Sequence, residues 1–175
     1  TPLSTRANVA YFGTFGYELD LNLLSEAEME RVKKQITFMK EYRNLIQVDG
    51  DFYRLLSPFE GNETSWMVVS QNKEQAVVGF YQRLNKVNAS WLRLKLAGLD
   101  ENTLYEVSCD MTPSASYDDR LAEIYGARTS EEMVKTYTAY GDELMQAGIP
   151  IDREDLNKKG GDFASLIYTL KKVQD

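Results

Sequence analysis

Hydrophobic positions in the first part of the chain recur at helical spacing. A first helix is predicted from apolar residues three or four positions apart: Leu3, Ala7, Ala10 and Tyr11. We expect Thr1 to cap this helix and Pro2 to occupy its first position. The glycine-rich run over residues 12–17 then ends or bends it. Gly13 and Gly16 are assigned a structural role, because a phosphate cradle would need a preceding strand and a third glycine or a lysine.

A second helix is predicted from residue 25 to about residue 44. Ser25 and Glu28 have the spacing of a capping box, in which each side chain accepts a hydrogen bond from the other residue's backbone amide. Four apolar residues follow on one face: Met29, Val32, Ile36 and Met39. An apolar face left bare tends to self-associate. We therefore expect the helices either to fold back on the rest of the chain or to drive dimerisation.

After residue 51 the spacing of apolar residues changes from three or four positions to two, which is typical of strands. The expected strands are residues 52–56, 66–69, 76–81, 91–96, 104–109 and 163–170. The clearest is 91–96, where three leucines alternate with Arg93 and Lys95. Gly160 and Gly161 supply a turn before the last strand. Short strands at close spacing favour an antiparallel sandwich.

The stretch from residue 117 to 148 has a different character and is interpreted as an excursion from the sheet. Short helices are predicted over 118–125 and 131–140, and Thr129 with Glu132 forms a second capping box at the start of the later one. The resulting fold class is α+β, with N-terminal helices followed by an antiparallel β-sandwich. The boundary between the two parts falls near residues 47–51.

Composition excludes several kinds of chemistry. A chain of 175 residues is about one domain in length. Histidine is absent, which rules out serine-histidine and cysteine-histidine catalysis and histidine-ligated metals. Cys109 is the single cysteine and is expected to be buried, so no internal disulfide or thiolate zinc site forms. The net charge of −7 opposes binding to nucleic acid or anionic lipid, and no apolar run is long enough to span a membrane.

Paired carboxylates are the strongest catalytic option for a chain without histidine, as in glycoside hydrolysis. Acidic pairs occur in loops or at helix ends: Glu18 and Asp20, Asp118 and Asp119, Asp142 and Glu143, Glu154 and Asp155. Adjacent acids point to opposite faces of a strand, or project about 100° apart on a helix, so none of these pairs is a catalytic dyad by itself. We interpret them as solvated surface or helix caps.

No metal site or cofactor is predicted. The acidic segments 49–51 and 152–155 lack the alternating oxygen ligands and distal glutamate of a helix-loop-helix calcium site. Both are expected to form turns.

Aromatic residues on the expected strands suggest a second function, sugar binding by ring stacking. The residues are Trp66, Tyr81, Trp91 and Tyr105. Large aromatics of a sandwich usually belong to its core. Trp91 is the candidate substrate-binding residue, because it shares the polar face of its strand with Arg93 and Lys95. An independent carbohydrate-binding module that uses Trp91 is therefore the alternative to a purely structural role.

Several motifs closely resemble the end of bacterial α-galactosidases of glycoside hydrolase family 36. The most specific is the string FGTFGYELD at residues 12–20. Further matching segments follow in order along the chain: 1–6, 53–59, 66–70, 98–105, 141–148 and 161–165. The resemblance covers nearly the whole chain and is weakest over residues 117–138.

The resemblance implies a division into two parts. Residues 1–47 correspond to the last helical segment of a catalytic (β/α)8 barrel, and residues 48–175 to a C-terminal antiparallel β domain. In this family two aspartates retain the anomeric configuration, and the nucleophile lies in a Lys-Trp-Asp motif. Neither Trp66 nor Trp91 is followed by aspartate, so the resemblance carries no catalytic residue onto this chain.

The expected function follows from this division. The chain would be a non-catalytic piece of an α-galactosidase that acts on oligosaccharides such as melibiose and raffinose, and it would support barrel stability or assembly. Its expected partners are the rest of its own barrel, α-galactoside substrates for the parent, and a second copy in a homo-oligomer. The chain opens on Thr1 without methionine, as a cut inside a longer protein would, and we expect a cytoplasmic location.

Overall fold

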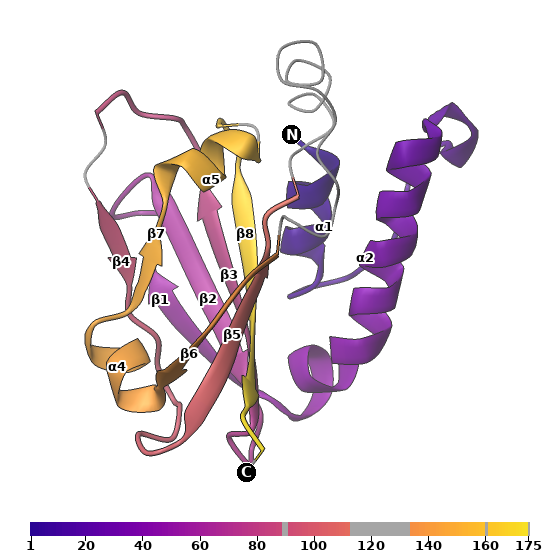
Figure 1. The fold of residues 1–175 in the computed structure, drawn as a ribbon. Helices are drawn as coiled ribbons and strands as arrows, with labels where there is room; N and C mark the ends of the chain where they lie inside the picture. The colour runs from indigo at the N-terminus through magenta and orange to yellow at the C-terminus, as the bar shows by residue number, and fades with distance from the viewer. Residues whose placement is uncertain (89–90, 113–133, 160, 175) are drawn as a thin grey trace.

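A six-stranded sheet forms the centre of the computed structural model, which describes residues 1–88, 91–112, 134–159 and 161–174 (Figure 1). The helical elements are α1 (Leu3–Ala10), η1 (Leu21–Leu23), α2 (Glu26–Asn44), η2 (Leu45–Asp49), α4 (Gly141–Gln146) and α5 (Arg153–Lys158). The strands are β1 (Asp51–Leu56), β2 (Glu63–Val69), β3 (Gln75–Gln82), β4 (Leu92–Leu94), β5 (Leu104–Asp110), β6 (Val134–Tyr140), β7 (Ile149–Ile151) and β8 (Ser165–Lys172).

The large sheet has the strand order β1-β2-β3-β8-β5-β6, and every neighbouring pair is antiparallel. Strand β8 comes from the end of the chain and inserts between β3 and β5, which ties the two halves of the sheet together. β4 and β7 form a separate two-stranded antiparallel sheet. The predicted class, α+β with an antiparallel sandwich after the N-terminal helices, is confirmed.

Helices α1 and α2 cover one face of the large sheet (Figure 1). Tyr42 of α2 and Leu45 of η2 pack with two strand residues: Val68 of β2 and Val77 of β3. Met39 turns toward α1 and packs there with other buried side chains: Ala7 and Tyr11. Of the predicted apolar face, Val32 and Met39 are buried, whereas Met29 and Ile36 are half-buried. The helices therefore fold back on the sheet, the first of the two expected outcomes.

The main core lies on the opposite face of the sheet. Val78 and Phe80 of β3 point into it, because alternate residues of a strand face opposite sides. The small sheet and the short helices cover it with fully buried apolar side chains: Leu94, Leu144, Ile149, Ile151 and Leu156. Each of these elements is short, and burial of its apolar side chains in the shared core holds it in place.

The Ser25–Glu28 capping box is confirmed at the start of α2. The Ser25 hydroxyl accepts a hydrogen bond of 3.3 Å from the Glu28 amide, and the Ser25 amide donates one of 2.9 Å to the Glu28 carboxylate. The hydrogen bonds that the Glu28 carboxylate accepts from the Ser25 amide and the Ser25 hydroxyl lower the pKa of Glu28. The expected cap at α1 is wrong, because Pro2 occupies the cap position and no side chain caps this helix.

The helix predicted over residues 131–140 is wrong within the described residues. Val134–Tyr140 is strand β6, in continuous register with β5 from Leu104↔Tyr140 to Asp110↔Val134. Threonine, tyrosine and valine dominate the segment and favour strands. The other predicted helix, 118–125, and the capping box at Thr129 and Glu132 lie outside the described residues.

Two smaller expectations also differ from the structure. The strand expected over 91–96 is hydrogen-bonded only over Leu92–Leu94, although buried and exposed residues continue to alternate to Leu96. The turn expected at 152–155 is instead the start of α5, where the Asp152 carboxylate accepts a hydrogen bond of 2.8 Å from the Glu154 amide. Asparagine or aspartate in this position is a strong helix start signal.

Candidate functional site

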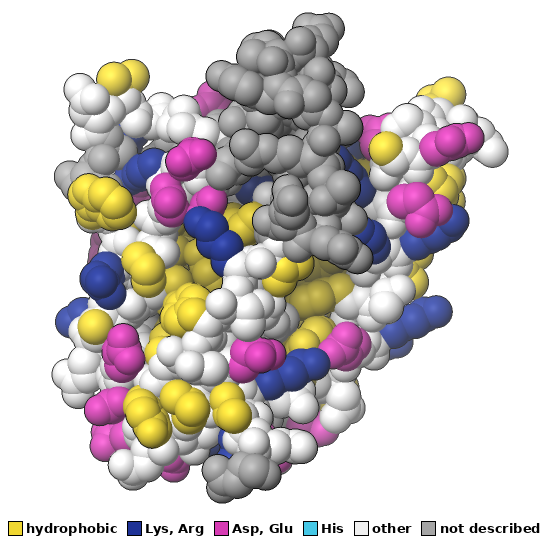
Figure 2. Space-filling model, viewed as in Figure 1, with side chains coloured by type: hydrophobic (Ala, Val, Ile, Leu, Met, Phe, Trp, Pro, Cys, Tyr) yellow, Lys and Arg dark blue, Asp and Glu magenta, His cyan; other side chains and the backbone are white. Residues whose placement is uncertain are grey.

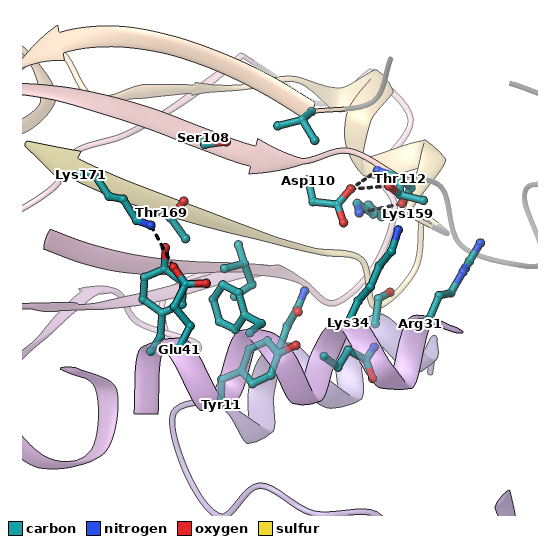
Figure 3. Close-up of a pocket in the computed structure, with 17 residues that line it drawn as sticks. Tyr11, Arg31, Lys34, Glu41, Ser108, Asp110, Thr112, Lys159, Thr169 and Lys171 are labelled. Atoms are coloured by element: carbon teal, nitrogen blue, oxygen red, sulfur yellow. Dashed lines mark hydrogen bonds and ion pairs between the residues drawn. The ribbon is translucent and has the colours of Figure 1, made fainter. Parts of the chain in front are cut away.

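A groove of about 450 Å³ lies between α2 and the part of the sheet that the helices leave uncovered (Figure 3). The polar side chains of its sheet wall include Ser108, Asp110 and Thr169. Arg31, Lys34 and Glu41 line it from α2, and Figure 3 shows Lys34 reaching toward the end of β5. Its lining includes six charged side chains: Arg31, Lys34, Glu41, Asp110, Lys159 and Lys171.

Lys159 and Asp110 form the charged end of the groove. Lys159 is 7% exposed and donates a hydrogen bond of 2.7 Å from Nζ to the Thr112 carbonyl. Burial lowers the pKa of Lys159, against the opposing effect of Asp110. Burial alone would raise the pKa of Asp110, but Lys159 and hydrogen bonds from Thr112 outweigh it and hold the pKa below its usual value. Asp110 is therefore a stable anion beside a buried cation.

Lys171 and Glu41 close the other end of the groove. Lys171 Nζ lies 2.9 Å from Glu41 Oε1 and 5.5 Å from the centre of the Tyr42 ring. The hydrogen bond to Glu41 raises the pKa of Lys171. Both side chains are about half exposed, so this ion pair contributes little to stability.

Asp110 lacks the environment of a general acid. A glycosidase acid must hold a proton near neutral pH, which requires a raised pKa. The pKa of Asp110 is lowered, and Glu41 accepts a hydrogen bond from Lys171. The groove can bind polar or charged groups through these side chains.

The acidic pairs predicted from the sequence are dispersed, and several have local structural partners. Asp20 accepts a hydrogen bond of 2.9 Å from the Asn22 amide at the start of η1. Asp142 accepts one of 2.7 Å from the Glu143 amide in the first turn of α4. Asp155 is 4% exposed, and its Oδ2 lies 2.5 Å from Lys135 Nζ in β6. The pair Asp118 and Asp119 lies outside the described residues.

The segment 49–51 joins η2 to β1. The Asp51 carboxylate accepts a hydrogen bond of 2.9 Å from Gln71 Nε2, which also donates one of 3.0 Å to the Asp49 carbonyl. Within the parts of the chain that the structure describes, no three acidic or cysteine side chains are grouped so that they could hold a metal ion. Over the same residues, no helix has the length and hydropathy to cross a bilayer.

Cys109 lies in the main core with 3% of its surface exposed. Burial raises the pKa of its thiol to about 12. The thiol is therefore protonated at neutral pH, and the expectation that Cys109 is buried is confirmed.

Among the four aromatic candidates for sugar stacking, Trp91 stands apart. It is 88% exposed, whereas Tyr81 and Tyr105 are buried. Trp66 is half-buried and packs 4.5 Å from the Tyr81 ring and 5.9 Å from the Phe12 ring, measured between centroids. The structure therefore leaves Trp91 as the one ring of the four that is free to stack on a ligand.

Comparison with known proteins decides the family. The family profile described as "Glycosyl hydrolase family 36 C-terminal domain" matches residues 63–170, and the profile described as "Melibiase" matches residues 1–49. This chain belongs to glycosyl hydrolase family 36. The first match ends with η2 and the second begins with β2, so the change from one profile to the other falls where the helical part of the chain gives way to the sheet.

Two curated α-galactosidases match the chain over nearly its whole length. Alpha-galactosidase AgaA of Geobacillus stearothermophilus is 40% identical over 98% of this chain, but the match covers 19% of AgaA. Alpha-galactosidase 1 of Pediococcus pentosaceus is 42% identical over 100% of this chain and 20% of the relative. The chain thus spans about a fifth of the length of these relatives.

Solved structures of α-galactosidases confirm the fold. The crystal structure of AgaA superimposes on 99% of this chain and 20% of its own, with a TM-score of 0.76 and 39% identity. The alpha-galactosidase from Lactobacillus brevis gives the same TM-score at 36% identity, over 100% of this chain and 20% of its own. A variant of AgaA was crystallised in complex with raffinose.

The groove was not foreseen from the sequence. Its residues come from elements far apart along the chain, with Lys34 on α2, Asp110 on β5 and Lys159 after α5. No spacing rule connects such positions. The one signal available was the polar character of the residues that alternate with the apolar ones in β5.

Proposed function

We propose that this chain is the C-terminal portion of a family 36 α-galactosidase and carries no catalytic residue of its own. The parent would remove terminal α-galactosyl residues from oligosaccharides such as melibiose and raffinose. One observation carries the proposal: the whole chain aligns with α-galactosidases of which it covers about a fifth. The raffinose bound to a variant of AgaA supports the substrate class.

The proposed division places residues 1–47 in the catalytic barrel and residues 48–175 in the terminal β domain. The segment between α1 and α2 supports it. Residues 14–19 make no backbone-to-backbone hydrogen bond with another described residue, although several of their side chains are apolar or aromatic and half-buried: Phe15, Tyr17 and Leu19. Unpaired backbone groups beside apolar side chains are the features of a strand that lacks its neighbours.

The local roles of the acids support the absence of a catalytic pair. Asp20 and Asp142 accept hydrogen bonds from nearby amides, Asp155 pairs with Lys135, and Asp110 is held ionised. In a barrel enzyme the reacting groups stand on loops at the carboxyl ends of the strands, whereas outer helices and appended domains hold the scaffold. The function proposed for this chain is to stabilise the last part of the barrel.

An assay with a chromogenic α-galactoside tests the proposal. The complete polypeptide should hydrolyse p-nitrophenyl α-galactoside, and the 175-residue chain alone should not. Turnover by the 175-residue chain that disappears when one of its own carboxylates is neutralised would overturn the proposal. An inactive complete polypeptide would overturn the assignment of the parent.

The alternative function is an independent carbohydrate-binding module, which the exposure of Trp91 favours. A pyranose can stack on an exposed indole, and binding would quench its fluorescence. Titration of the chain with raffinose decides between the two functions. Saturable quenching that is lost in Trp91→Ala supports the module, whereas an unchanged spectrum supports the structural role.

A further inference from the structure

Five large apolar side chains stand exposed at one end of the β domain. Phe59 is 96% exposed, Val87 93% and Trp91 88%, and Leu84 and Phe163 are about half exposed. We call these five residues the apolar end. Figure 2 shows hydrophobic side chains at the upper left of the molecule, around the loop between β3 and β4. Exposed apolar side chains gathered in one region indicate a contact surface.

Hydrogen bonds join the three segments that carry this surface. Asn62 follows the turn that contains Phe59. Its Nδ2 donates a hydrogen bond of 2.7 Å to the Leu84 carbonyl, and its Oδ1 accepts a hydrogen bond of 3.0 Å from the Leu84 amide. The Phe163 amide donates 2.8 Å to the Arg83 carbonyl. The β1–β2 turn, the start of the β3–β4 loop and the segment before β8 are therefore held side by side.

Trp91 lies at the same end through β4 and α5. It immediately precedes β4, whose first residue Leu92 pairs with Ile151 at the end of β7. α5 follows β7 directly. It is joined to the β3–β4 loop by a hydrogen bond of 3.1 Å that Asn85 Nδ2 donates to Asn157 Oδ1. The apolar end is consequently one region of the fold built from four connected segments.

This region lies beside the N-terminus of α1 (Figure 1). The Thr5 hydroxyl donates a hydrogen bond of 2.7 Å to the Phe163 carbonyl, so the first turn of α1 contacts the apolar end directly. A polypeptide that continues before Thr1 leaves the fold at this place. The relatives of this chain are about five times its length, so the parent proposed above has a large folded body to place there.

The direction of the segment between α1 and α2 indicates which part of the preceding parent chain lies near the apolar end. The Gly13 carbonyl accepts a hydrogen bond of 2.6 Å from the side chain of Gln47, beyond the end of α2. The Tyr17 hydroxyl donates a hydrogen bond of 2.6 Å to the side chain of Gln35, in the middle of α2. The segment therefore runs antiparallel to α2 and ends level with the start of that helix. If it is a barrel strand, its carboxyl end and the loops of the catalytic face point to the same end of the molecule as the apolar end.

We propose that the apolar end is a docking surface for the part of the parent chain that precedes Thr1, and that it contacts the barrel on the side of its catalytic loops. The proposal rests on the proposed function, because it takes the missing four-fifths of an α-galactosidase as the occupant. The docking surface consists of five residues: Phe59, Leu84, Val87, Trp91 and Phe163. Contact there would fix the β domain relative to the catalytic face.

Thiol labelling of the complete polypeptide tests the proposal. Phe59→Cys and Val87→Cys place a thiol at the two most exposed positions of the apolar end. Glu101→Cys, in the exposed turn before β5 at the opposite end of the sheet, is the matched control. Each variant is treated with iodoacetamide, and mass spectrometry of the peptide that contains the new cysteine gives its alkylation rate.

The expected result is at least a tenfold slower alkylation at positions 59 and 87 than at position 101, with equal rates for all three in denaturant. Equal rates in the native protein would overturn the proposal. Protection that disappears when a native oligomer is diluted to monomers would also overturn it, because the occupant would be a second copy. Hydrolysis of p-nitrophenyl α-galactoside by each unlabelled variant shows separately that the proposed function holds and that the variant is folded.

Discussion

The hydroxyl oxygens of Thr5 and Ser165 lie 2.8 Å apart in a buried hydrogen bond that joins α1 to β8. Thr5 has one hydroxyl proton, which it donates to the Phe163 carbonyl at 2.7 Å, so Ser165 must donate to Thr5. Asn8 Nδ2 then donates 2.8 Å to Ser165. All three hydrogen bonds run from α1 or Ser165 toward the Phe163 carbonyl, and they fix the start of α1 at the beginning of β8, an inner strand of the sheet.

Replacement of Thr5 by valine should weaken this attachment. Thr5→Val keeps the shape of the side chain but leaves the Ser165 proton and the Phe163 carbonyl without their partner. The expected loss is about 1–3 kcal/mol in the free energy of unfolding, the usual cost of an unsatisfied buried polar group. Urea unfolding of the 175-residue chain measures it. Thr14→Val, at an exposed threonine, is the control and should change stability by less than about 0.5 kcal/mol.

The cap of α2 gives a second prediction. Ser25→Ala removes the side-chain acceptor of the Glu28 amide, and the expected cost is about 1 kcal/mol. Ser25→Asp should restore most of this stability, because aspartate is an equally good cap and its charge favours the helix N-terminus. Thermal unfolding followed by circular dichroism compares the variants. Equal stability of the alanine and aspartate variants would contradict a capping role.

Asp110 predicts a pH dependence of stability. Its pKa is lower in the folded chain than the unfolded value of about 3.9, so its contribution is fully present above that value. The contribution is lost as pH falls through the lower, folded pKa. Asp110→Asn should therefore be less stable than the original chain at pH 6, and the difference should shrink as pH falls below about 4.

Unfolding by urea at a series of pH values checks this expectation. Glu60→Gln is the control, since Glu60 is exposed and in the surface turn between β1 and β2. Its effect should be small across the whole pH range. A stability difference for Asp110→Asn that stays constant down to pH 2 would show that the carboxylate is not stabilised by Lys159 and Thr112.

The elements that the sequence predicts well are those in which one hydrophobic pattern, helical or strand-like, continues over many residues. The helix from Ser25 was visible because a capping box precedes an apolar face, and β3 because residues 76–81 combine β-branched and aromatic side chains. Both are long enough for local preference and burial to agree. The sequence prediction agrees with the structure wherever the same residues favour the local element and are also buried by it.

The short elements could not be predicted because the tertiary core determines them. β7 is three residues long and contains Pro150, and α4 and α5 have six residues each. Isolated pieces of this length are unstable in water. They form because Ile149, Leu144 and Leu156 are buried in the core against the large sheet. β6 was mistaken for a helix for a related reason, since its pairing partner lies about thirty residues away in β5.

The candidate sites show the same limit. The exposure of Trp91 followed from the alternation with Arg93 and Lys95 along one strand. The groove with Lys159 and Asp110 joins residues that are distant in sequence, so a periodic pattern contains no information about it. The burial of Asp155 beside the half-exposed Lys135 is likewise not predicted from the sequence, because charged residues are normally exposed.

The two tryptophans allow a direct test of the sheet and its surface. Trp66 packs between Phe12 and Tyr81, whereas Trp91 is 88% exposed. In the Trp66→Phe variant of the 175-residue chain, the remaining Trp91 should be quenched strongly by acrylamide and emit at a wavelength close to that of free tryptophan. In Trp91→Phe the remaining Trp66 should emit further to the blue and show a Stern–Volmer constant several times smaller. Equal constants in the two variants would contradict the packing of α1 on β2 and β3, because Phe12 and the helix shield Trp66.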